Sequence, residues 1–268
     1  MNFFLTFAFM KIALLGYGKM GQAVEAAAVE RGHNVLTTID NEDEWTSNRN
    51  IVGQCDIAID FSMPSTAVEN IHRSFDMNLP IVVGTTGWYD QLEATIAECK
   101  QRKQSLFVAS NFSIGMNIMF DLNRRLSQLM NGRTEYNVSI AETHHVHKLD
   151  APSGTAITLA NDTINMLDNK TQWTLNGELW IGTDNQVDQK KSVQPADRSS
   201  LPADTIPILS VRQAEEPGTH TVVYDGPIDT IFLSHRAKNR KGLAVGAVLA
   251  AEFLVGKHGY YTMTDLLK

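Results

Sequence analysis

The stretch Lys11-Ile-Ala-Leu-Leu-Gly-Tyr-Gly-Lys-Met-Gly21 decides the fold of the first part of the chain. Its apolar residues 12–15 predict a short buried strand, and the pattern G-x-G-x-x-G follows at Gly16–Gly21. Alanines and valines then recur at helical spacing over 22–30, so the motif lies between a strand and a helix. In that context Gly16 permits a tight turn, Gly18 lets the backbone approach a pyrophosphate, and Gly21 lets the helix pack closely. The stretch predicts a Rossmann-type dinucleotide-binding unit.

Strands and helices alternate from this motif to Phe112, which is typical of a parallel sheet with helices on both faces. We expect further strands at 34–39, 56–61, 80–83 and 105–109, and helices at 66–77 and 89–103.

The regular alternation of strands and helices ends after Asn117. We expect helices at 118–129, 152–167 and 242–255, a half-buried strand at 136–141, and an irregular stretch at 176–205. Apolar and polar residues alternate in the segments 206–211, 219–224 and 230–234, as in antiparallel strands with one solvent-exposed face. The fold class predicted is α/β, with an N-terminal Rossmann-type doubly wound parallel sheet and a second α+β domain.

Asp40 ends the second expected strand, 22 residues beyond Gly18 (40 − 18), where an acid binds the adenosine ribose. The next residues, Asn41-Glu-Asp-Glu44, hold three carboxylates and no arginine, which disfavours a 2′-phosphate. We therefore predict NADH as the preferred cofactor. NADPH stays an alternative, because Lys19 could reach its extra phosphate.

Two other strand ends, Asp60-Phe-Ser62 and Gly84-Thr-Thr-Gly87, are rich in glycine or hydroxyl groups. Ligands gather at the carboxyl ends of strands in open α/β sheets, so both segments could line the ribose and nicotinamide. Ordinary tight turns between strand and helix are an equally good interpretation.

The segment Glu142-Thr-His-His-Val-His-Lys-Leu-Asp-Ala-Pro-Ser-Gly-Thr-Ala156 leaves a strand, crosses a loop of titratable groups and enters a helix. A helix start at Pro152 or Ser153 would present the N–H groups of Gly154 and Thr155 to a carboxylate. Together with Lys148, the histidines indicate proton transfer beside a bound carboxylate.

Two other interpretations of this segment stay open. Zinc could be held by His144, His145 and His147, although no cysteine is near and Lys148 would repel a cation. The loop could also be a solvated polar loop without a site. We predict that no metal is bound.

Composition excludes several classes of protein. The net charge of −7, from 23 basic and 30 acidic residues, argues against nucleic-acid binding. The cysteines Cys55 and Cys99 are too few for a disulfide framework and indicate a reducing compartment, so we expect a cytoplasmic protein. Lys11 interrupts the apolar N-terminal run, so a membrane span is not expected. Residues 1–9 are predicted to be an extension before a start at Met10, without a role in the fold.

The segment 142–156 closely resembles the signature of the dihydrodipicolinate reductase family, E-x-H-H-x-x-K-x-D-x-P-S-G-T-A, at every fixed position. The resemblance extends to the glycine motif, to Gly84–Thr86, to Ala109–Phe112 and to Gly218-Thr-His-Thr221. Val146 and Thr219 depart from residues common in the family, an arginine and an acid.

This resemblance implies reduction of 4-hydroxy-tetrahydrodipicolinate to tetrahydrodipicolinate with NAD(P)H, in diaminopimelate and lysine biosynthesis. The family's proton donor falls on His144, and its second acid and substrate contact falls on Lys148. The substrate-binding positions fall on His145, Gly154 and Thr155. The cofactor positions fall on Gly16, Tyr17, Gly18, Lys19, Met20, Gly21, Asp40, Gly84, Thr85, Thr86, Ala109, Ser110, Asn111 and Phe112.

The resemblance also implies that the last helix returns to the first domain. The expected domains are 10–112 with 236–268 for the dinucleotide, and 113–235 for a small dicarboxylate substrate and assembly of a homotetramer.

Two alternative functions remain at this point. One is a related dehydrogenase of amino-acid precursors such as a semialdehyde, although neither Cys55 nor Cys99 lies in an activated cysteine motif. The other is a dinucleotide sensor without catalysis, which would not explain the histidines and lysine of 144–148.

Overall fold

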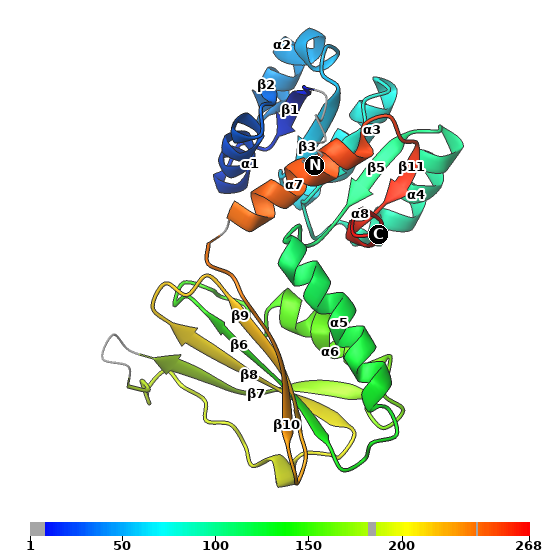
Figure 1. The fold of residues 1–268 in the computed structure, drawn as a ribbon. Helices are drawn as coiled ribbons and strands as arrows, with labels where there is room; N and C mark the ends of the chain where they lie inside the picture. The colour runs from blue at the N-terminus through cyan, green and yellow to red at the C-terminus, as the bar shows by residue number, and fades with distance from the viewer. Residues whose placement is uncertain (1–8, 182–185, 240) are drawn as a thin grey trace, which may run out of the picture. The chain divides into compact units, whose positions relative to one another are not determined.

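The computed structural model describes residues 9–181, 186–239 and 241–268. The chain forms two compact units: one comprises residues up to Ile114 and Lys241–Lys268, and the other comprises Gly115–Arg240 (Figure 1). The return to the first unit lies later than the predicted position 236, because the last strand of the second unit runs through Arg236. The predicted extension falls almost entirely on residues 1–8, which lie outside the described residues.

The first unit contains a six-stranded parallel sheet in the order β11-β5-β4-β3-β1-β2, as the Rossmann prediction requires. Its strands are β1 (Lys11–Leu15), β2 (Asn34–Ile39), β3 (Ile57–Asp60), β4 (Ile81–Val83), β5 (Ser105–Val108) and β11 (Gly259–Tyr261). Its helices are α1 (Lys19–Glu30), α2 (Glu42–Val52), α3 (Pro64–Asp76), η1 (Tyr89–Gln91), α4 (Leu92–Gln101), α7 (Lys241–Leu254) and α8 (Met263–Leu266).

Each face of this sheet has its own core, because successive residues of a strand point to opposite faces. Ile12 and Leu14 pack with α1 and α7 on one face. Ala13 and Leu15 pack with α2, α3 and α4 on the other. All four residues of β1 that follow Lys11 are at most 1% exposed, so the strand is covered on both sides, as predicted.

Three elements of the first unit were missed by the sequence analysis, namely α2, β11 and α8. The sequence of α2 is polar and lacks a clear apolar stripe, but its start is well capped, since the side chain of Asn41 accepts from the backbone N–H of Glu44. The short strand β11 forms by pairing with β5, a contact over 150 residues along the chain that no local pattern encodes.

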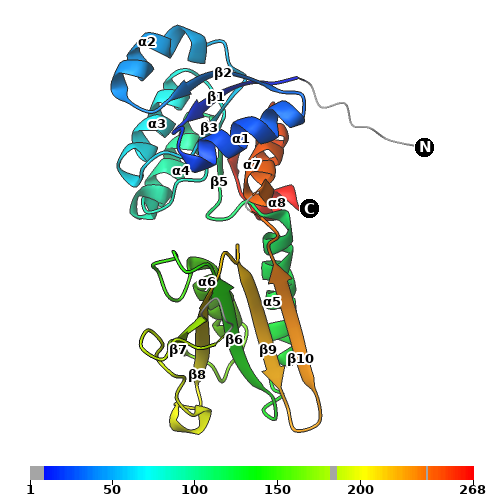
Figure 2. The same cartoon turned by 90° about the vertical axis from the view of Figure 1, so that its left-hand side faces the viewer.

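The second unit is built on a five-stranded mixed sheet in the order β10-β9-β6-β8-β7 (Figure 2). Its strands are β6 (Asn137–His144), β7 (Gln172–Ile181), β8 (Thr205–Gln213), β9 (Thr219–Asp225) and β10 (Thr230–Arg236). The helices α5 (Ile114–Met130) and α6 (Gly154–Ile164) supply the core on one face, and η2 (Arg198–Ser200) is a short turn of helix.

The expectation of three antiparallel strands is partly wrong. The strands β9 and β10 are antiparallel, but β8 runs parallel to both β6 and β7. Alternation reports which face of a strand is buried and says nothing of its direction, so the sequence pattern is the same in both cases. The strand β7 also extends into the stretch 176–205 that was expected to be irregular.

The helix α7 is tied to the first unit by a buried carboxylate. Glu252, whose side chain is 2% exposed, accepts two hydrogen bonds of 2.8 Å from the guanidinium of Arg31, and its Oε1 lies 2.8 Å from Nε2 of His33. Burial alone would raise the pKa of Glu252, but the contacts with Arg31 and His33 outweigh it and lower the pKa. The last long helix is therefore joined to α1 and to the turn before β2.

Glu252→Gln should lower the free energy of unfolding of the first unit by roughly 3 kcal/mol, because it removes the buried negative charge that pairs with Arg31 and His33. Urea unfolding at pH 7 measures this. The folded-state pKa of Glu252 is lowered, so the stabilisation is present at neutral pH and is lost as the pH falls through that pKa. The difference between wild type and variant should therefore shrink in acid.

Glu30→Gln is the matched control, because Glu30 also joins α1 to α7, through Lys241, but its side chain is 62% exposed. Its unfolding midpoint should stay close to that of the wild type. Equal destabilisation by the two variants would contradict the role given to Glu252.

Candidate active site

The glycine motif forms a tight turn between β1 and α1. Gly16 has φ +87°, and a Cβ there would lie 2.4 Å from the carbonyl oxygen of Phe61. A Cβ on Gly21 would lie 2.3 Å from the carbonyl oxygen of Gly16, so helix and turn are packed together. A Cβ on Gly18, by contrast, would meet no atom within 4 Å. The exposed backbone at Gly18, where α1 begins, is thus open to a phosphate group.

Asp40 lies beside this turn, as the sequence spacing predicts. Its Oδ1 accepts a 2.6 Å hydrogen bond from the backbone N–H of Tyr17, while its own N–H donates to the Glu44 carboxylate. Asp40 is exposed, as are Gly18 and Lys19. The end of β2 is therefore joined to the glycine turn by a carboxylate that also faces solvent.

The ends of β3 and β4 are joined by a buried acid. Asp60 is fully buried, and its carboxylate accepts from Thr85 Oγ1 at 2.5 Å, from Asn70 Nδ2 at 2.7 Å and from the hydroxyl of Ser62 at 3.0 Å. Burial raises the pKa of Asp60, and these hydrogen bonds oppose the rise. Gly84 packs directly against the ring of Phe61, because a Cβ there would lie 2.2 Å from that ring.

The segment 109–112 follows β5 at the same edge. Phe112 is buried and its ring stacks 5.9 Å from that of Phe107, while Ser110 is exposed. Because parallel strands end at one edge of their sheet, the structure brings every predicted cofactor segment to the carboxyl edge of β1 to β5.

The segment 142–156 begins as the end of β6 and leads into α6 through a loop. Ser153 caps α6, since its Oγ accepts from the N–H of Ala156 at 3.2 Å. In β6 the inward positions are Val138, Ile140, Glu142 and His144, so one face of one strand changes from apolar to titratable along its length. The core of the second unit therefore continues directly into a group of polar side chains.

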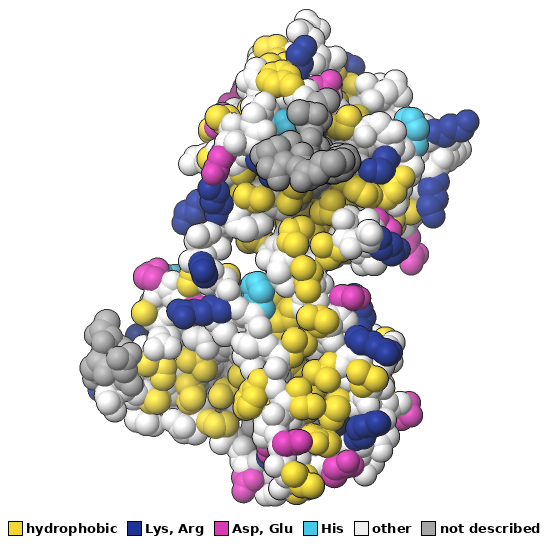
Figure 3. Space-filling model, in the orientation of Figure 1, with side chains coloured by type: hydrophobic (Ala, Val, Ile, Leu, Met, Phe, Trp, Pro, Cys, Tyr) yellow, Lys and Arg dark blue, Asp and Glu magenta, His cyan; other side chains and the backbone are white. Residues whose placement is uncertain are grey.

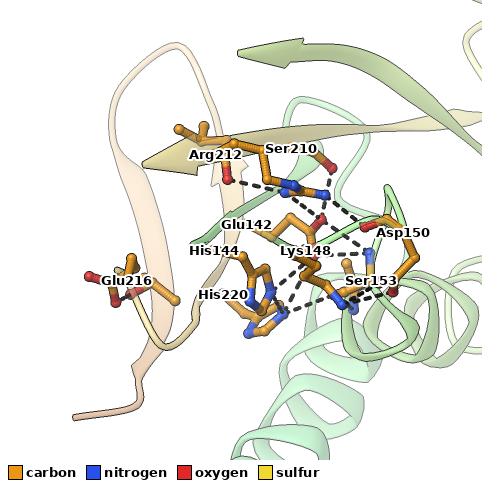
Figure 4. A network of polar contacts seen from close by, with 12 residues as sticks. Glu142, His144, Lys148, Asp150, Ser153, Ser210, Arg212, Glu216 and His220 are labelled. Carbon is orange, nitrogen blue, oxygen red and sulfur yellow. Dashed lines mark hydrogen bonds and ion pairs between the residues drawn. The ribbon is translucent and has the colours of Figure 1, made fainter. Parts of the chain in front are cut away.

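We call these side chains the buried cluster (Figure 4). It comprises Glu142, His144, Ser153, Ser210, Arg212 and His220.

Glu142, only 1% exposed, lies at the centre of the buried cluster. Its carboxylate accepts from the N–H of Ser153 at 3.1 Å and from the hydroxyl of Ser210 at 2.8 Å. Its Oε2 lies 3.5 Å from Nε2 of His144 and 3.6 Å from Nε2 of His220. Burial would raise the pKa of Glu142, but the contacts with the two histidines and two serines hold the pKa well below its usual range. The carboxylate is therefore ionised at neutral pH.

Arg212 supplies the opposite charge. Its side chain is fully buried, with Nη1 3.6 Å from the Glu142 carboxylate and Nε 3.8 Å from that of Glu178. Its Nη2 donates to the backbone carbonyl of Asp150 at 2.7 Å, which fixes the loop between β6 and α6. The pairing of Arg212 with Glu142 offsets part of the cost of burying either charge.

Two histidines of the buried cluster face each other. The Nε2 atoms of His144 and His220 lie 3.3 Å apart, and Ser153 Oγ lies 3.1 Å from Nε2 of His220. Burial lowers the pKa of His220, although Glu142 opposes this, so His220 is neutral at pH 7. The two rings come from β6 and β9, which are neighbours in the sheet.

The other predicted substrate residues lie on the loop and at the start of α6. Lys148 Nζ contacts both oxygens of Asp150, at 2.7 and 2.8 Å, and His145 is half-buried. Gly154 is exposed, and a Cβ there would meet no atom within 4 Å. Thr155 is half-buried in the first turn of α6. The loop thus places an ammonium and an open helix start on the same segment as His144.

The set of metal-capable side chains differs from the one considered in the sequence. His147 is exposed and pairs with Glu215, whereas within the described ranges the three groups close enough to share an ion are Glu142, His144 and His220. The Glu142 carboxylate is already engaged by two serines, and buried Arg212 would repel a cation. These contacts favour a hydrogen-bonded cluster over a metal centre.

The site predicted from the sequence did not include Ser210, Arg212 or His220, and it gave no role to Glu142. Two signals point to them. The alternation in β6 continues from Ile140 to Glu142 and His144, and in β8 from Ile208 to Ser210 and Arg212. These residues lie side by side because of the strand register, which pairs Glu142 with Ser210 on one side and with His220 on the other.

Two family models together match almost the whole chain. Residues 10–112 match the family model for the N-terminus of dihydrodipicolinate reductase, and residues 115–267 match the model for its C-terminus.

Relatives along the whole chain carry the name 4-hydroxy-tetrahydrodipicolinate reductase. One from Christiangramia forsetii is 41% identical over 258 residues, covering 96% of this chain and 98% of the relative. One from Staphylococcus aureus is 32% identical over 264 residues, covering 96% of this chain and all of the relative.

Among solved structures, the fold resembles that of dipicolinate-bound dihydrodipicolinate reductase from Paenisporosarcina sp. TG-14, with a TM-score of 0.71 and 22% identity over 95% of this chain and 97% of that one. A probable dehydrogenase from Thermotoga maritima is a more distant match, with a TM-score of 0.53 and 9% identity over 96% of this chain and 92% of that one. From the two family matches and the identity to its relatives, the chain belongs to the dihydrodipicolinate reductase family.

Proposed function

We propose that this chain reduces 4-hydroxy-tetrahydrodipicolinate to tetrahydrodipicolinate with NAD(P)H, a step of diaminopimelate and lysine biosynthesis. The observation that carries the proposal is the segment 142–155, which places His144 in the buried cluster and Lys148 and the open start of α6 on one loop. The relatives' shared name and the dipicolinate-bound relative support a small dicarboxylate as substrate.

The residues of the first unit fit a bound dinucleotide. The open backbone at Gly18 and the start of α1 would hold the pyrophosphate, and Asp40 would bind the adenosine ribose. The remaining positions follow along the carboxyl edge of the sheet, on Gly16, Tyr17, Lys19, Met20, Gly21, Gly84, Thr85, Thr86, Ala109, Ser110, Asn111 and Phe112. The nicotinamide supplies the hydride when bound.

The protein's part in the chemistry is to bind two carboxylates and to deliver a proton. The N–H groups of Gly154 and Thr155 and the ammonium of Lys148 would bind the carboxylates, with His145 beside them. Hydride addition leaves an atom of the substrate that needs a proton, which His144 would donate, with Lys148 as the second acid. The overall change adds one hydride and one proton and releases the 4-hydroxyl group as water.

The turnover rate of the His144→Gln variant and that of the Lys148→Met variant should each fall by roughly 10²- to 10⁴-fold, because each variant removes a proposed proton donor. The measurement is oxidation of NADH on adding the product of the upstream synthase, made in situ. His147→Gln is the control, since this neighbouring histidine is exposed and should be dispensable. Full activity in both His144→Gln and Lys148→Met would overturn the proposal. A wild-type protein without turnover of this substrate would favour a related dehydrogenase or a dinucleotide sensor.

NADH is proposed as the preferred cofactor, with NADPH as the alternative. Three carboxylates begin α2 beside Asp40, and Arg73, which contacts the first of them, is paired with both Glu42 and Glu69. A 2′-phosphate would meet these carboxylates, with exposed Lys19 as the nearby cation.

The wild type should show a higher kcat/KM with NADH than with NADPH. Asp40→Ala should lower kcat/KM for NADH by roughly tenfold or more and affect NADPH less, because it removes the charged acceptor for the ribose hydroxyl. Glu30→Ala, which removes an exposed carboxylate at the end of α1 far from the glycine turn, is the control and should keep the wild-type ratio. A tenfold advantage of the wild type for NADPH would refute the assignment.

A homotetramer is proposed from the sheet face of the second unit that lies opposite α5 and α6. Ala141 pairs with Leu209 across β6 and β8, and Val223 pairs with Phe232 across β9 and β10, so apolar side chains continue over neighbouring strands. Phe232 is 67% exposed. Hydrophobic side chains are visible on the surface of this unit (Figure 3). Exposed apolar faces of this kind are typical of subunit interfaces.

Sedimentation equilibrium should give a mass about four times the 29.7 kDa of the chain. Phe232→Asp should shift the protein to smaller species, because it places a charge on the proposed interface. Val29→Asp, which changes an apolar residue of α1 that is 60% exposed, should not. A monomeric wild type at micromolar concentration would contradict the proposal.

A cytoplasmic location is proposed as well. Both cysteines are free thiols, Cys99 being buried, which suits a reducing compartment. Over the described ranges no helix is long and apolar enough to cross a membrane.

A further inference from the structure

His220 of the buried cluster has, around its Nε2, two neighbours that can donate a hydrogen bond to it and one, the Glu142 carboxylate, that can only accept. Its Nε2 lies 3.1 Å from Ser153 Oγ and 3.3 Å from Nε2 of His144 (Figure 4). The residue is 5% exposed, so protein groups rather than bulk water must satisfy this nitrogen.

The number of hydrogens decides how these contacts are made. A neutral imidazole has one N–H and one bare nitrogen. If Nε2 of His220 carried the hydrogen, it could donate to only one of its three neighbours. If Nε2 is bare, it can accept from both His144 and Ser153. Ser153 has its hydroxyl hydrogen free for this, because its oxygen already accepts from Ala156 N–H.

Glu142 selects between the two tautomers of His144. Its ionised carboxylate can only accept, and its Oε2 lies 3.5 Å from Nε2 of His144. A hydrogen on that Nε2 therefore has two acceptors in front of it, the bare nitrogen of His220 and the Glu142 carboxylate. The carboxylate also lies 3.6 Å from Nε2 of His220, so one Nε2–H of the pair should face it, and the Ser153 hydroxyl, which can donate to Nε2 of His220, assigns that hydrogen to His144.

We propose that His220 is a positioning residue that, with Ser153 and Glu142, keeps His144 in the form with hydrogen on Nε2 and leaves Nδ1 for the reacting proton. The inference rests on the proposed function, whose proton donor is His144. His220 acts through that ring, and its effect is to fix which nitrogen faces the chemistry.

The surroundings of Nδ1 agree with this assignment. A Cβ on Gly218 would lie 3.2 Å from Nδ1 and 3.0 Å from Cε1 of His144, so a glycine keeps that edge of the ring free of a side chain. Gly218 also has φ +150°, a conformation that other residues rarely adopt. The His144 ring is thus held at Nε2 by side chains and bordered at Nδ1 by backbone.

The reaction moves one proton from His144 to the reduced substrate. In the reacting state His144 carries hydrogen on both nitrogens. Its Nδ1–H bond breaks and a new bond to hydrogen forms on the reduced substrate. The ring becomes neutral and keeps its hydrogen on Nε2, where the acceptors already stand. No rearrangement of the buried cluster is required during the transfer.

Kinetics of three variants test the positioning role. His220→Leu cannot accept a hydrogen bond and should lower kcat by roughly 10- to 100-fold with little change in KM, as expected of a residue that acts through His144 and not on substrate binding. His220→Gln, whose side-chain oxygen can accept, should recover most of kcat. His235→Gln is the matched control, because His235 is the register partner of His220 on β10 and should leave kcat unchanged. All assays contain EDTA, so that no metal held by the same groups contributes.

A spectroscopic measurement tests the inference without turnover. In protein with ¹⁵N-labelled histidine and no substrate, at alkaline pH, His144 should show a protonated Nε2 and a bare Nδ1. His220→Leu should give a mixture of tautomers, and His220→Gln the wild-type pattern. The wild-type spectrum needs no variant to fold.

The inference would be overturned by a bare Nε2 in wild-type His144, by wild-type kcat in His220→Leu, or by a His220→Gln variant no better than His220→Leu. Absence of reductase activity in the wild type would instead refute the proposed function, and the tautomer measured in the same protein would still decide the inference.

Discussion

The carboxylate of Glu142 lies where β6, β8, β9 and the start of α6 meet, and each neighbouring element supplies at least one of its contacts. Ser210 and Arg212 come from β8, His220 from β9 and the N–H of Ser153 from the helix start. A buried carboxylate without such partners would be too costly to keep ionised. The arrangement of these four elements is therefore tied to the geometry of one charge, and so is the position of His144, the next inward residue of β6.

The strands that form the core of the second unit also carry the side chains of the buried cluster. Ile140, Ile208 and Val222 pack under the helices, and the next inward positions of their strands are Glu142, Ser210 and His220. Because side chains two residues apart share a face, the packing that fixes the register of the apolar residues also fixes the polar ones. The first unit works differently: its predicted cofactor residues stand on the ends of separate parallel strands, joined by the carboxylates of Asp40 and Asp60.

Much of the first unit could be predicted because its signals are local. Gly21 is required by its contact with Gly16 in the same turn, and β1 is an uninterrupted apolar run. The helix α2 was missed because capping by Asn41, rather than an apolar stripe, marks it. The direction of β8 and the contact of Glu252 with His33 were missed because they depend on partners distant in the chain.

The sequence by itself determined the Rossmann turn, the position of Asp40, the alternation in β6 and the family to which the segment 142–156 belongs, since each lies in contiguous residues. Only the tertiary structure decided that the histidine facing His144 is His220 and not His145 or His147, and that Arg212 balances Glu142. These contacts arise from strand register and burial. A buried charge takes its partner from whichever strand the fold places beside it, and sequence spacing carries no record of that neighbour.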